Sequence, residues 1–186
     1  LESCTVGSSE FSLCYAASRG IVPLMDNGHY HPTESVADKI PTLLLFFDRI
    51  ALHITRSIRW DSDHVVTFDD ETRAIAEQIC NDEAYKRIFI ALDYFDASIN
   101  RIAAWVSGYR NLQKALLAGL LMPGKQMLEY QNNADFTRLF MLREELKTLP
   151  FSDVWNRFCE ENSVVSDKYL YGEVKKYEDE ILSKRV

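Results

Sequence analysis

Three runs of residues decide the fold of this chain: I-V-P-L-M-D-N-G-H-Y-H-P-T-E at 21–34, A-L-H-I-T-R-S-I-R-W-D-S-D-H at 51–64 and I-A-L-D-Y-F-D-A-S-I-N-R at 90–101. Each run is an apolar segment that ends in carboxylates and imidazoles. Short apolar segments bounded by turn residues are typical of buried strands. Since parallel strands of a (β/α) barrel deliver their polar residues to the same end, we expect these side chains to lie together.

The predicted elements alternate between strand and helix. A helix at 10–17, ended by Arg19-Gly20, precedes strands at 21–25, 50–55 and 87–92, and helices follow these strands at 33–47, 69–80 and 99–121. The third strand reads I-F-I-A-L without alternation, which predicts burial on both faces. This order predicts an α/β fold with a parallel sheet. Three strand–helix units cannot close a barrel of eight, so the chain is either a small α/β domain or part of a barrel lacking its N-terminal side.

The character of the chain changes after residue 124. Residues 125–186 contain no strand-like run and are rich in Glu, Lys, Leu and Tyr. This pattern predicts two or three amphipathic helices, broken near Pro150 and around 163–167. We therefore expect a partial barrel at 1–123 and a C-terminal helical extension at 124–186.

The composition narrows the class of protein. A net charge of −7 gives no reason to expect a nucleic-acid partner, and no apolar run approaches the length of a membrane span. The first residues do not form a signal peptide, and the absence of an initiator Met suggests a fragment or a processed product. The four cysteines (Cys4, Cys14, Cys80, Cys159) lack metal-site spacing and are expected to be free thiols. We expect a cytoplasmic protein with no membrane partner.

Six residues at the strand ends are candidate metal ligands. Asp26 and His29 form D-x-x-H after the first strand, although Asp-Asn-Gly alone is also an ordinary turn. A lone strand histidine such as His53 is usually a core residue, but this one shares its strand end with two aspartates. Asp61 and Asp63 lie two residues apart, so they point the same way in extended backbone and repel unless a cation lies between them.

Asp93 ends the third strand, where a buried carboxylate needs a partner. Asp96 is interpreted as the N-cap of the next helix, and the aromatic residues Tyr94, Phe95, Trp105 and Trp155 as core or interface. Carboxylates and imidazoles suit Mn²⁺, Co²⁺, Mg²⁺ or Zn²⁺. A two-metal site is therefore the leading physical hypothesis.

The three motifs closely resemble the L-rhamnose isomerase family. The similarity is carried by D-N-G-H-Y-H-P-T-E, by R-W-D-S-D-H-V-V and by L-D-Y-F-D-A-S-I-N-R-I-A-A-W-V, and it extends over essentially the whole chain. The resemblance implies a (β/α)₈ barrel, usually a homotetramer, that interconverts L-rhamnose and L-rhamnulose. It also implies two divalent metal ions, commonly Mn²⁺, that assist a hydride shift between C1 and C2 of the open-chain sugar.

The resemblance also implies roles for the six candidates. Asp26, His53 and Asp93 match ligands of a structural metal. His29, Asp61 and Asp63 match ligands of a second, catalytic metal, with Asp26 shared by the two sites. In the family a further Glu ligand, followed two residues on by a Lys, ends the preceding strand, and neither matches a position in this sequence.

The chain therefore resembles the C-terminal portion of the enzyme and lacks roughly five of the eight strands. We expect it to be inactive by itself. Two alternatives stay open at this point: a divalent-metal sugar epimerase or hydrolase on a related barrel, and a non-catalytic remnant.

Overall fold

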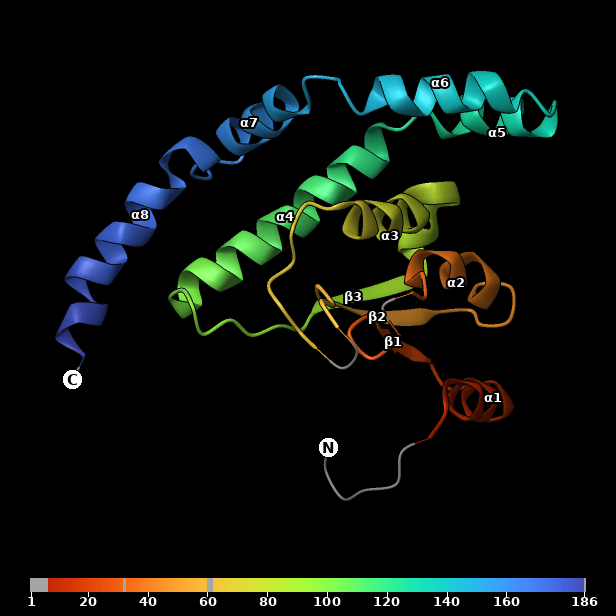
Figure 1. Ribbon diagram of the computed structural model, residues 1–186, viewed down its shortest axis with the longest axis horizontal. Helices are drawn as coiled ribbons and strands as arrows, with labels where there is room; N and C mark the ends of the chain where they lie inside the picture. Colours follow the sequence, from red (N-terminus) through yellow and green to blue (C-terminus); the bar gives the residue numbers. More distant parts are fainter. Residues whose placement is uncertain (1–6, 32, 60–61, 186) are drawn as a thin grey trace.

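A parallel three-stranded sheet forms the centre of the molecule (Figure 1). The computed structural model describes residues 7–31, 33–59 and 62–185. The strands are β1 (Leu24–Asp26), β2 (Ile50–Ile54) and β3 (Ile88–Leu92), in the order β1-β2-β3. Their register places Asp26 beside His53 and His53 beside Ala91. The expected parallel arrangement is confirmed, and it brings the carboxyl ends of all three strands to one edge.

Helices cover one face of this sheet. The strands are connected by α2 (Val36–Leu43) and α3 (Asp70–Cys80), and β3 is followed by α4 (Arg101–Leu121). Helix α3 packs most extensively against α4, and α2 packs against α3 (Figure 1). A short 3-10 helix, η1 (Asn81–Lys86), lies between α3 and β3. The core between helices and sheet contains side chains that are almost wholly buried: Ile40, Ile50, Leu52, Ile54, Ile75, Ile79. Burial of branched apolar side chains is the main term that holds these elements together.

The opposite face of the sheet is open in the described residues. Leu24 and Phe89, which flank Ala51 in the register, are 53% and 52% exposed. The expectation that the third strand is buried on both faces is therefore wrong here, because its middle three residues are exposed. A parallel strand needs cover on both faces, and this part of the chain supplies it on one.

Several helix boundaries follow from side-chain caps. Helix α1 (Ser9–Arg19) ends at Gly20 in the left-handed conformation (φ 65°), as Arg19-Gly20 predicts. Helix α2 starts later than expected from residue 33, because the Ser35 side chain accepts a hydrogen bond from the Asp38 backbone N–H at 3.3 Å. Asp69 caps α3 in the same way, by accepting from the backbone N–H of Thr72, as predicted.

The prediction that Asp96 caps the next helix is wrong. The N-cap of α4 is Asn100, whose side-chain oxygen accepts from the Ala103 backbone N–H at 2.7 Å. Asp96 instead accepts from the backbone N–H of Ser98 at 2.7 Å and from its hydroxyl at 2.6 Å. These hydrogen bonds hold the pKa of Asp96 below its usual value. Asp96 therefore stabilises a local bend of the chain at residues 96–98. Helix α4 begins only after this bend, at Arg101.

Four helices follow α4 and are here called the helical arm: α5 (Gly124–Asn132), α6 (Phe136–Leu146), α7 (Phe151–Glu161) and α8 (Asp167–Glu180). Helices α5 and α6 pack side by side, and α7 and α8 follow them past α4 (Figure 1). The predicted breaks near Pro150 and around 163–167 are confirmed. A further break between α5 and α6, where Ala134 takes φ 55°, brings the number of α-helices above the two or three predicted.

Two further expectations concern membrane-spanning helices and the state of the cysteines. No helix within residues 7–31, 33–59 and 62–185 combines the length and the apolar character needed to cross a membrane. Cys14, Cys80 and Cys159 are free thiols, as predicted, and Cys4 lies outside the described residues. Burial raises the pKa of the Cys80 thiol to about 11.

Candidate metal centre

Asp26 is the residue around which the candidate site is built. It ends β1 and is 6% exposed. Its Oδ1 accepts a hydrogen bond from the Gly28 backbone N–H at 2.9 Å. Its Oδ2 is buried and makes no hydrogen bond to any described residue. A buried carboxylate oxygen in this state is costly, which points to a cation as its partner.

One group of donors combines Asp26 with His53 and Asp93. His53 comes from β2, and its Nδ1 lies 3.4 Å from Asp26 Oδ2 and 3.6 Å from Asp93 Oδ2. Asp93 follows β3 directly and is held to β2 by a hydrogen bond from its backbone N–H to the Ile54 carbonyl at 3.3 Å. One ligand atom from each residue lies within 4.8 Å of the others. The sheet register therefore gathers these three candidates at one point.

A second group combines Asp26 with His29 and Asp63. The D-x-x-H segment folds as a turn in which the His29 backbone N–H donates to the Asp26 carbonyl at 3.2 Å. Asp63 reaches the same place from the loop after β2, and the three ligand atoms again lie within 4.8 Å. Asp61, the remaining candidate, lies outside the described residues. Within the described chain, Asp26 is thus common to both groups.

The loop that carries Asp63 is closed at its base. Arg56 and His64 exchange two backbone hydrogen bonds, of 3.0 and 3.2 Å. Near the tip, the Ser62 hydroxyl accepts from the backbone N–H groups of Ile58 and Arg59 at 3.2 and 3.1 Å. The described residues of this segment, 56–59 and 62–64, are here called the lobe. Hydrogen bonds hold them together, and Asp63 lies beside the paired base.

The residues present fit a divalent cation. Three carboxylates and two imidazoles converge, and hard oxygen and imidazole donors are the ligands of Mn²⁺, Mg²⁺, Co²⁺ and Zn²⁺. Asp26 belongs to both groups, and its Oδ2 has no hydrogen-bond partner in the described chain. Like-charged carboxylates this close repel one another unless a positive charge lies among them. The donor set and its charge therefore favour metal binding.

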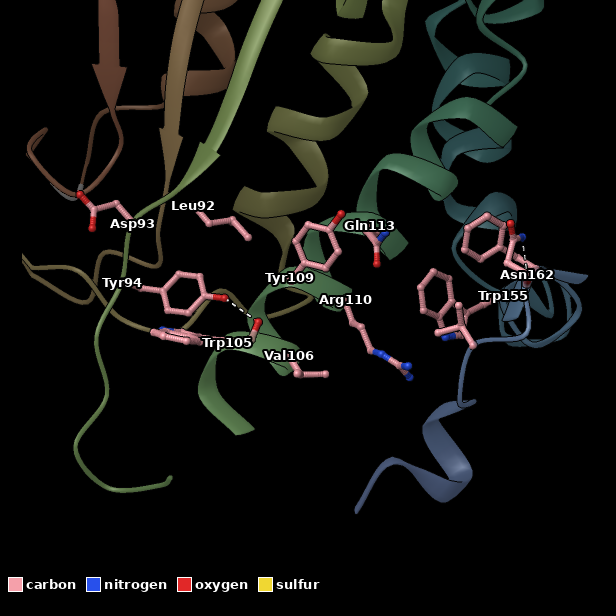
Figure 2. Close-up of a pocket in the computed structure, with 12 residues that line it drawn as sticks. Leu92, Asp93, Tyr94, Trp105, Val106, Tyr109, Arg110, Gln113, Trp155 and Asn162 are labelled. Atoms are coloured by element: carbon pink, nitrogen blue, oxygen red, sulfur yellow. Dashed lines mark hydrogen bonds between the residues drawn. The ribbon is translucent and has the colours of Figure 1, made fainter. Parts of the chain in front are cut away.

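An aromatic cavity opens beside Asp93 (Figure 2). It has a volume of about 920 Å³ and lies between the segment after β3, helix α4 and helix α7. Tyr94, Trp105 and Tyr109 line one side of it and Trp155 the other. These aromatic residues were expected in the core or at an interface. Trp155 is in the core, at 4% exposure, whereas Trp105 and Phe95 are 53% and 64% exposed and lie outside it.

Tyr94 is held against α4 by a close fit to Gly108. A Cβ at Gly108 would lie 2.3 Å from the tyrosine hydroxyl oxygen, so a larger residue would displace the ring. The hydroxyl donates to the Trp105 carbonyl at 2.9 Å (Figure 2). Burial raises the pKa of Tyr94. The neighbour of Asp93 is therefore anchored to the helix that follows it.

Two residues that shape the site were not identified from the sequence. Asn27 and Gly28 were treated only as parts of a common turn, yet both are buried between the two ligand-bearing loops. The available signal was their position, since they lie between two candidate ligands in D-N-G-H. A turn interpretation explains the chain reversal but says nothing about a second loop 28 residues further along.

The comparisons with known proteins agree on one family. The family model described as L-rhamnose isomerase (RhaA) matches residues 1–185. The L-rhamnose isomerase of Pectobacterium atrosepticum is 50% identical over 184 residues, which cover 99% of this chain and 44% of that protein. The L-rhamnose isomerase of Mannheimia succiniciproducens is 50% identical over 186 residues, 100% of this chain and 45% of that protein. The Yersinia pestis enzyme of the same name is 49% identical over 184 residues.

The match covers nearly every residue of this chain but less than half the length of these curated relatives. The strand-end motifs and the donor groups that they form fall within the matched region. On this evidence, the chain belongs to the L-rhamnose isomerase family.

Proposed function

We propose that this chain is the metal-binding portion of an aldose–ketose isomerase that interconverts L-rhamnose and L-rhamnulose. The observation that carries the proposal is the pair of donor groups sharing buried Asp26, found in a chain of this family. The relatives carry the activity in their names, and a portion containing such a site is the part in which the chemistry is expected to occur.

The six sequence-predicted residues divide into two sets. We assign Asp26, His53 and Asp93 to a structural ion, and His29, Asp61 and Asp63 to a catalytic ion, with Asp26 contributing to both. Mn²⁺ is the proposed metal, and Co²⁺, Mg²⁺ or Zn²⁺ suit the same donors. When bound, such ions supply Lewis-acid stabilisation of negative charge on the sugar oxygens during a hydride shift between C1 and C2.

The side chains of the chain itself would hold the ions, orient the sugar and shield the donor set from water. Burial of Asp26 keeps water from one side of the donor set, whereas the exposed His29 and Asp93 leave the other side open to a polyol. The aromatic cavity continues outward from Asp93, and its rings offer apolar faces beside the open side of the site. A sugar approaching from this side would meet the donors without displacing any element of the sheet.

The proposal includes a partial (β/α)₈ barrel at 1–123 and a helical extension at 124–186. The open sheet face supports it, since Leu24 and Phe89 lie where a closed barrel would have its packed interior. The exposed apolar residues of the helical arm support a role in subunit contacts, and the full-length protein is proposed to be a cytoplasmic homotetramer. Isolated from the rest of the barrel, the chain is proposed to be inactive.

A complementation assay tests the function. The 186-residue chain is refolded with Mn²⁺ and the N-terminal part of the Pectobacterium atrosepticum relative, and rhamnulose formation from L-rhamnose is followed. We expect activity from the mixture and none from either polypeptide separately. The same relative, divided at the equivalent point and refolded from its own two parts, is the positive control.

Other outcomes would contradict the proposal in different ways. Activity from this chain by itself would contradict its incompleteness. A different product, or water-dependent cleavage of the substrate, would favour an epimerase or a hydrolase. An inactive mixture beside an active control, with no Mn²⁺ bound by the chain, would identify a non-catalytic remnant.

A further inference from the structure

A buried side-chain amide joins the two loops that carry the second donor group. Asn27 lies between Asp26 and Gly28 and is 3% exposed. Its Nδ2 donates to the Thr55 carbonyl at 2.8 Å, and its Oδ1 accepts from the Thr55 backbone N–H, also at 2.8 Å. The side chain therefore pairs with both backbone polar groups of Thr55, just beyond β2, and extends the β1–β2 pairing past the end of both strands.

A third contact fixes the orientation of the amide. Asn27 Nδ2 also lies 3.3 Å from Glu71 Oε1, on α3. An ionised carboxylate only accepts hydrogen bonds, so it selects the rotamer in which Nδ2 faces Glu71 and the Thr55 carbonyl. All polar atoms of the buried amide are therefore used.

The partner of Asn27 begins the lobe that carries Asp63. Thr55 is 1% exposed, and its hydroxyl donates to the His64 carbonyl at 3.1 Å. His64 follows Asp63 directly and is paired with Arg56 through the backbone. Displacement of Thr55 would therefore displace the base of the lobe and Asp63 with it.

Gly28 brings the two loops into direct contact. An ideal Cβ at this position would lie 2.2 Å from Asp63 Oδ1 and 2.8 Å from Thr55 Cγ2. The Ser62 backbone N–H donates to the Gly28 carbonyl at 3.4 Å. The first loop and the lobe thus meet at Asn27 through hydrogen bonds and at Gly28 through close packing.

We propose that Asn27 is a positioning residue that holds Asp63 at ligand distance from Asp26 and His29. The proposal rests on the proposed metal site and assigns Asn27 to one of its two donor groups. The other group does not need this contact, because His53 and Asp93 are placed by the β2–β3 ladder. Loss of the Asn27 side chain should therefore weaken metal binding at the group that contains Asp63 and leave the affinity of the other group unchanged.

The test is the variant Asn27→Ala in the 186-residue chain, titrated with Mn²⁺ by calorimetry. We expect one of two binding events to weaken by roughly 10- to 100-fold, the usual effect of losing a residue that orients metal ligands. The other event should keep its affinity. A second measurement, made without metal, is amide hydrogen exchange at Thr55, Arg56 and His64, which should become roughly 2- to 10-fold faster when the hydrogen bonds of Asn27 are lost.

Asn100→Ala is the matched control. Asn100 also accepts from a backbone N–H and donates to a carboxylate, Glu178, but it caps α4 away from Asp63. A purely structural role for Asn27 predicts that both variants lower stability and that neither variant weakens one Mn²⁺-binding event selectively. That result, or unchanged exchange at Arg56 and His64 in Asn27→Ala, would overturn the proposal.

The experiment also separates this proposal from the proposed function. A wild-type chain that binds no Mn²⁺ contradicts the metal site. Faster exchange confined to Thr55, Arg56 and His64 in Asn27→Ala would still support the attachment of the two loops, and unchanged exchange would refute it.

Discussion

The sheet region and the helical arm are both rich in apolar residues, but they bury them very differently. The sheet, α2 and α3 enclose a core in which five isoleucines and Leu52 are 0–1% exposed. In the described arm the buried apolar side chains are Met127, Trp155 and Cys159, while Phe136, Phe140 and Met141 are more than 60% exposed. A sheet offers a broad apolar surface that helices can cover, whereas the arm, with one helix pair and two further helices, offers no such surface.

Polar contacts attach the arm to the sheet region. Arg143 on α6 makes two hydrogen bonds to Glu77 on α3, of 3.2 and 2.6 Å. Arg110 on α4 is buried and lies 3.0 Å from Asp167 at the start of α8. The position of the sheet elements is therefore set mainly by apolar burial, and that of the arm to a large degree by ion pairs.

The largest expected effect comes from Asp26→Asn. Because Asp26 belongs to both donor groups, this variant should lose Mn²⁺ affinity by more than the roughly 100-fold that outer residues contribute. The metal-free protein should become more stable by about 1 kcal/mol, since the substitution removes a negative charge that lies close to Asp63 and Asp93. Calorimetric titration and thermal unfolding in EDTA measure the two opposite changes.

The control for this variant is Asp135→Asn in the arm, where the side chain caps α6 and asparagine caps equally well. It should change neither quantity. Retention of both binding events in Asp26→Asn would contradict the shared role of this carboxylate.

The contrast in burial is sharpened by truncating one apolar side chain in each region. Ile79→Ala on α3, at 0% exposure, should lower the free energy of unfolding by about 2–5 kcal/mol through a cavity. Phe140→Ala on α6, at 64% exposure, should change it by less than about 0.5 kcal/mol. Urea denaturation measures both. A large loss in Phe140→Ala would mean that the arm is packed against a second copy, which size-exclusion chromatography would detect.

The attachment of the arm is tested by Asp167→Asn. The variant leaves buried Arg110 without its charged partner and should destabilise the protein by about 1.5–3 kcal/mol, near the lower end because Asp167 is 39% exposed. Asp179→Asn is the control, since it removes the same charge from α8 but pairs only with exposed Lys175. An equal effect of the two variants would show that the Arg110 contact is unimportant.

The same ion pair predicts a dependence on pH. Burial raises the pKa of Asp167, but hydrogen bonds from Lys114 and Arg110 outweigh it and the pKa lies below the ordinary 3.8. The stabilisation is therefore complete above pH 3.8 and is lost as the pH falls through the lower folded-state pKa. Thermal unfolding of wild type and Asp167→Asn should converge over this acidic range.

The smallest effect is chemical and leaves stability unchanged. Exposed Cys14 should be alkylated first at pH 8, whereas Cys80, with a pKa of about 11, should react slowly and about tenfold faster for each pH unit gained. Cys159 on α7 is wholly buried and should react only if the arm leaves α4. Peptide mass spectrometry distinguishes the sites, and rapid labelling of Cys159 would contradict a docked arm.

Much of the sheet region could be predicted because its signals are local. The strand ends at Asp26, His53 and Asp93 follow apolar runs, and parallel pairing then brings them together. The cap of α4 was missed because Asp96 and Asn100 are both good N-caps, and the choice depends on where the chain returns to the core. The exposure of Phe89 could not be predicted from its apolar run, because a strand pattern assumes a covering layer.

By itself, the sequence determined the alternation of strands and helices, the six donor candidates and the family they resemble, because these depend on residue type and spacing. The resemblance already implied that Asp26 is shared, and the structure places it in both donor groups. Only the tertiary structure decided that Asn27 and Gly28 join the loops beside it. It also decided that ion pairs help to attach the arm, which leaves many of its apolar side chains exposed. These are relations between residues far apart in the chain, and they arise only when packing and hydrogen bonding place one loop against another.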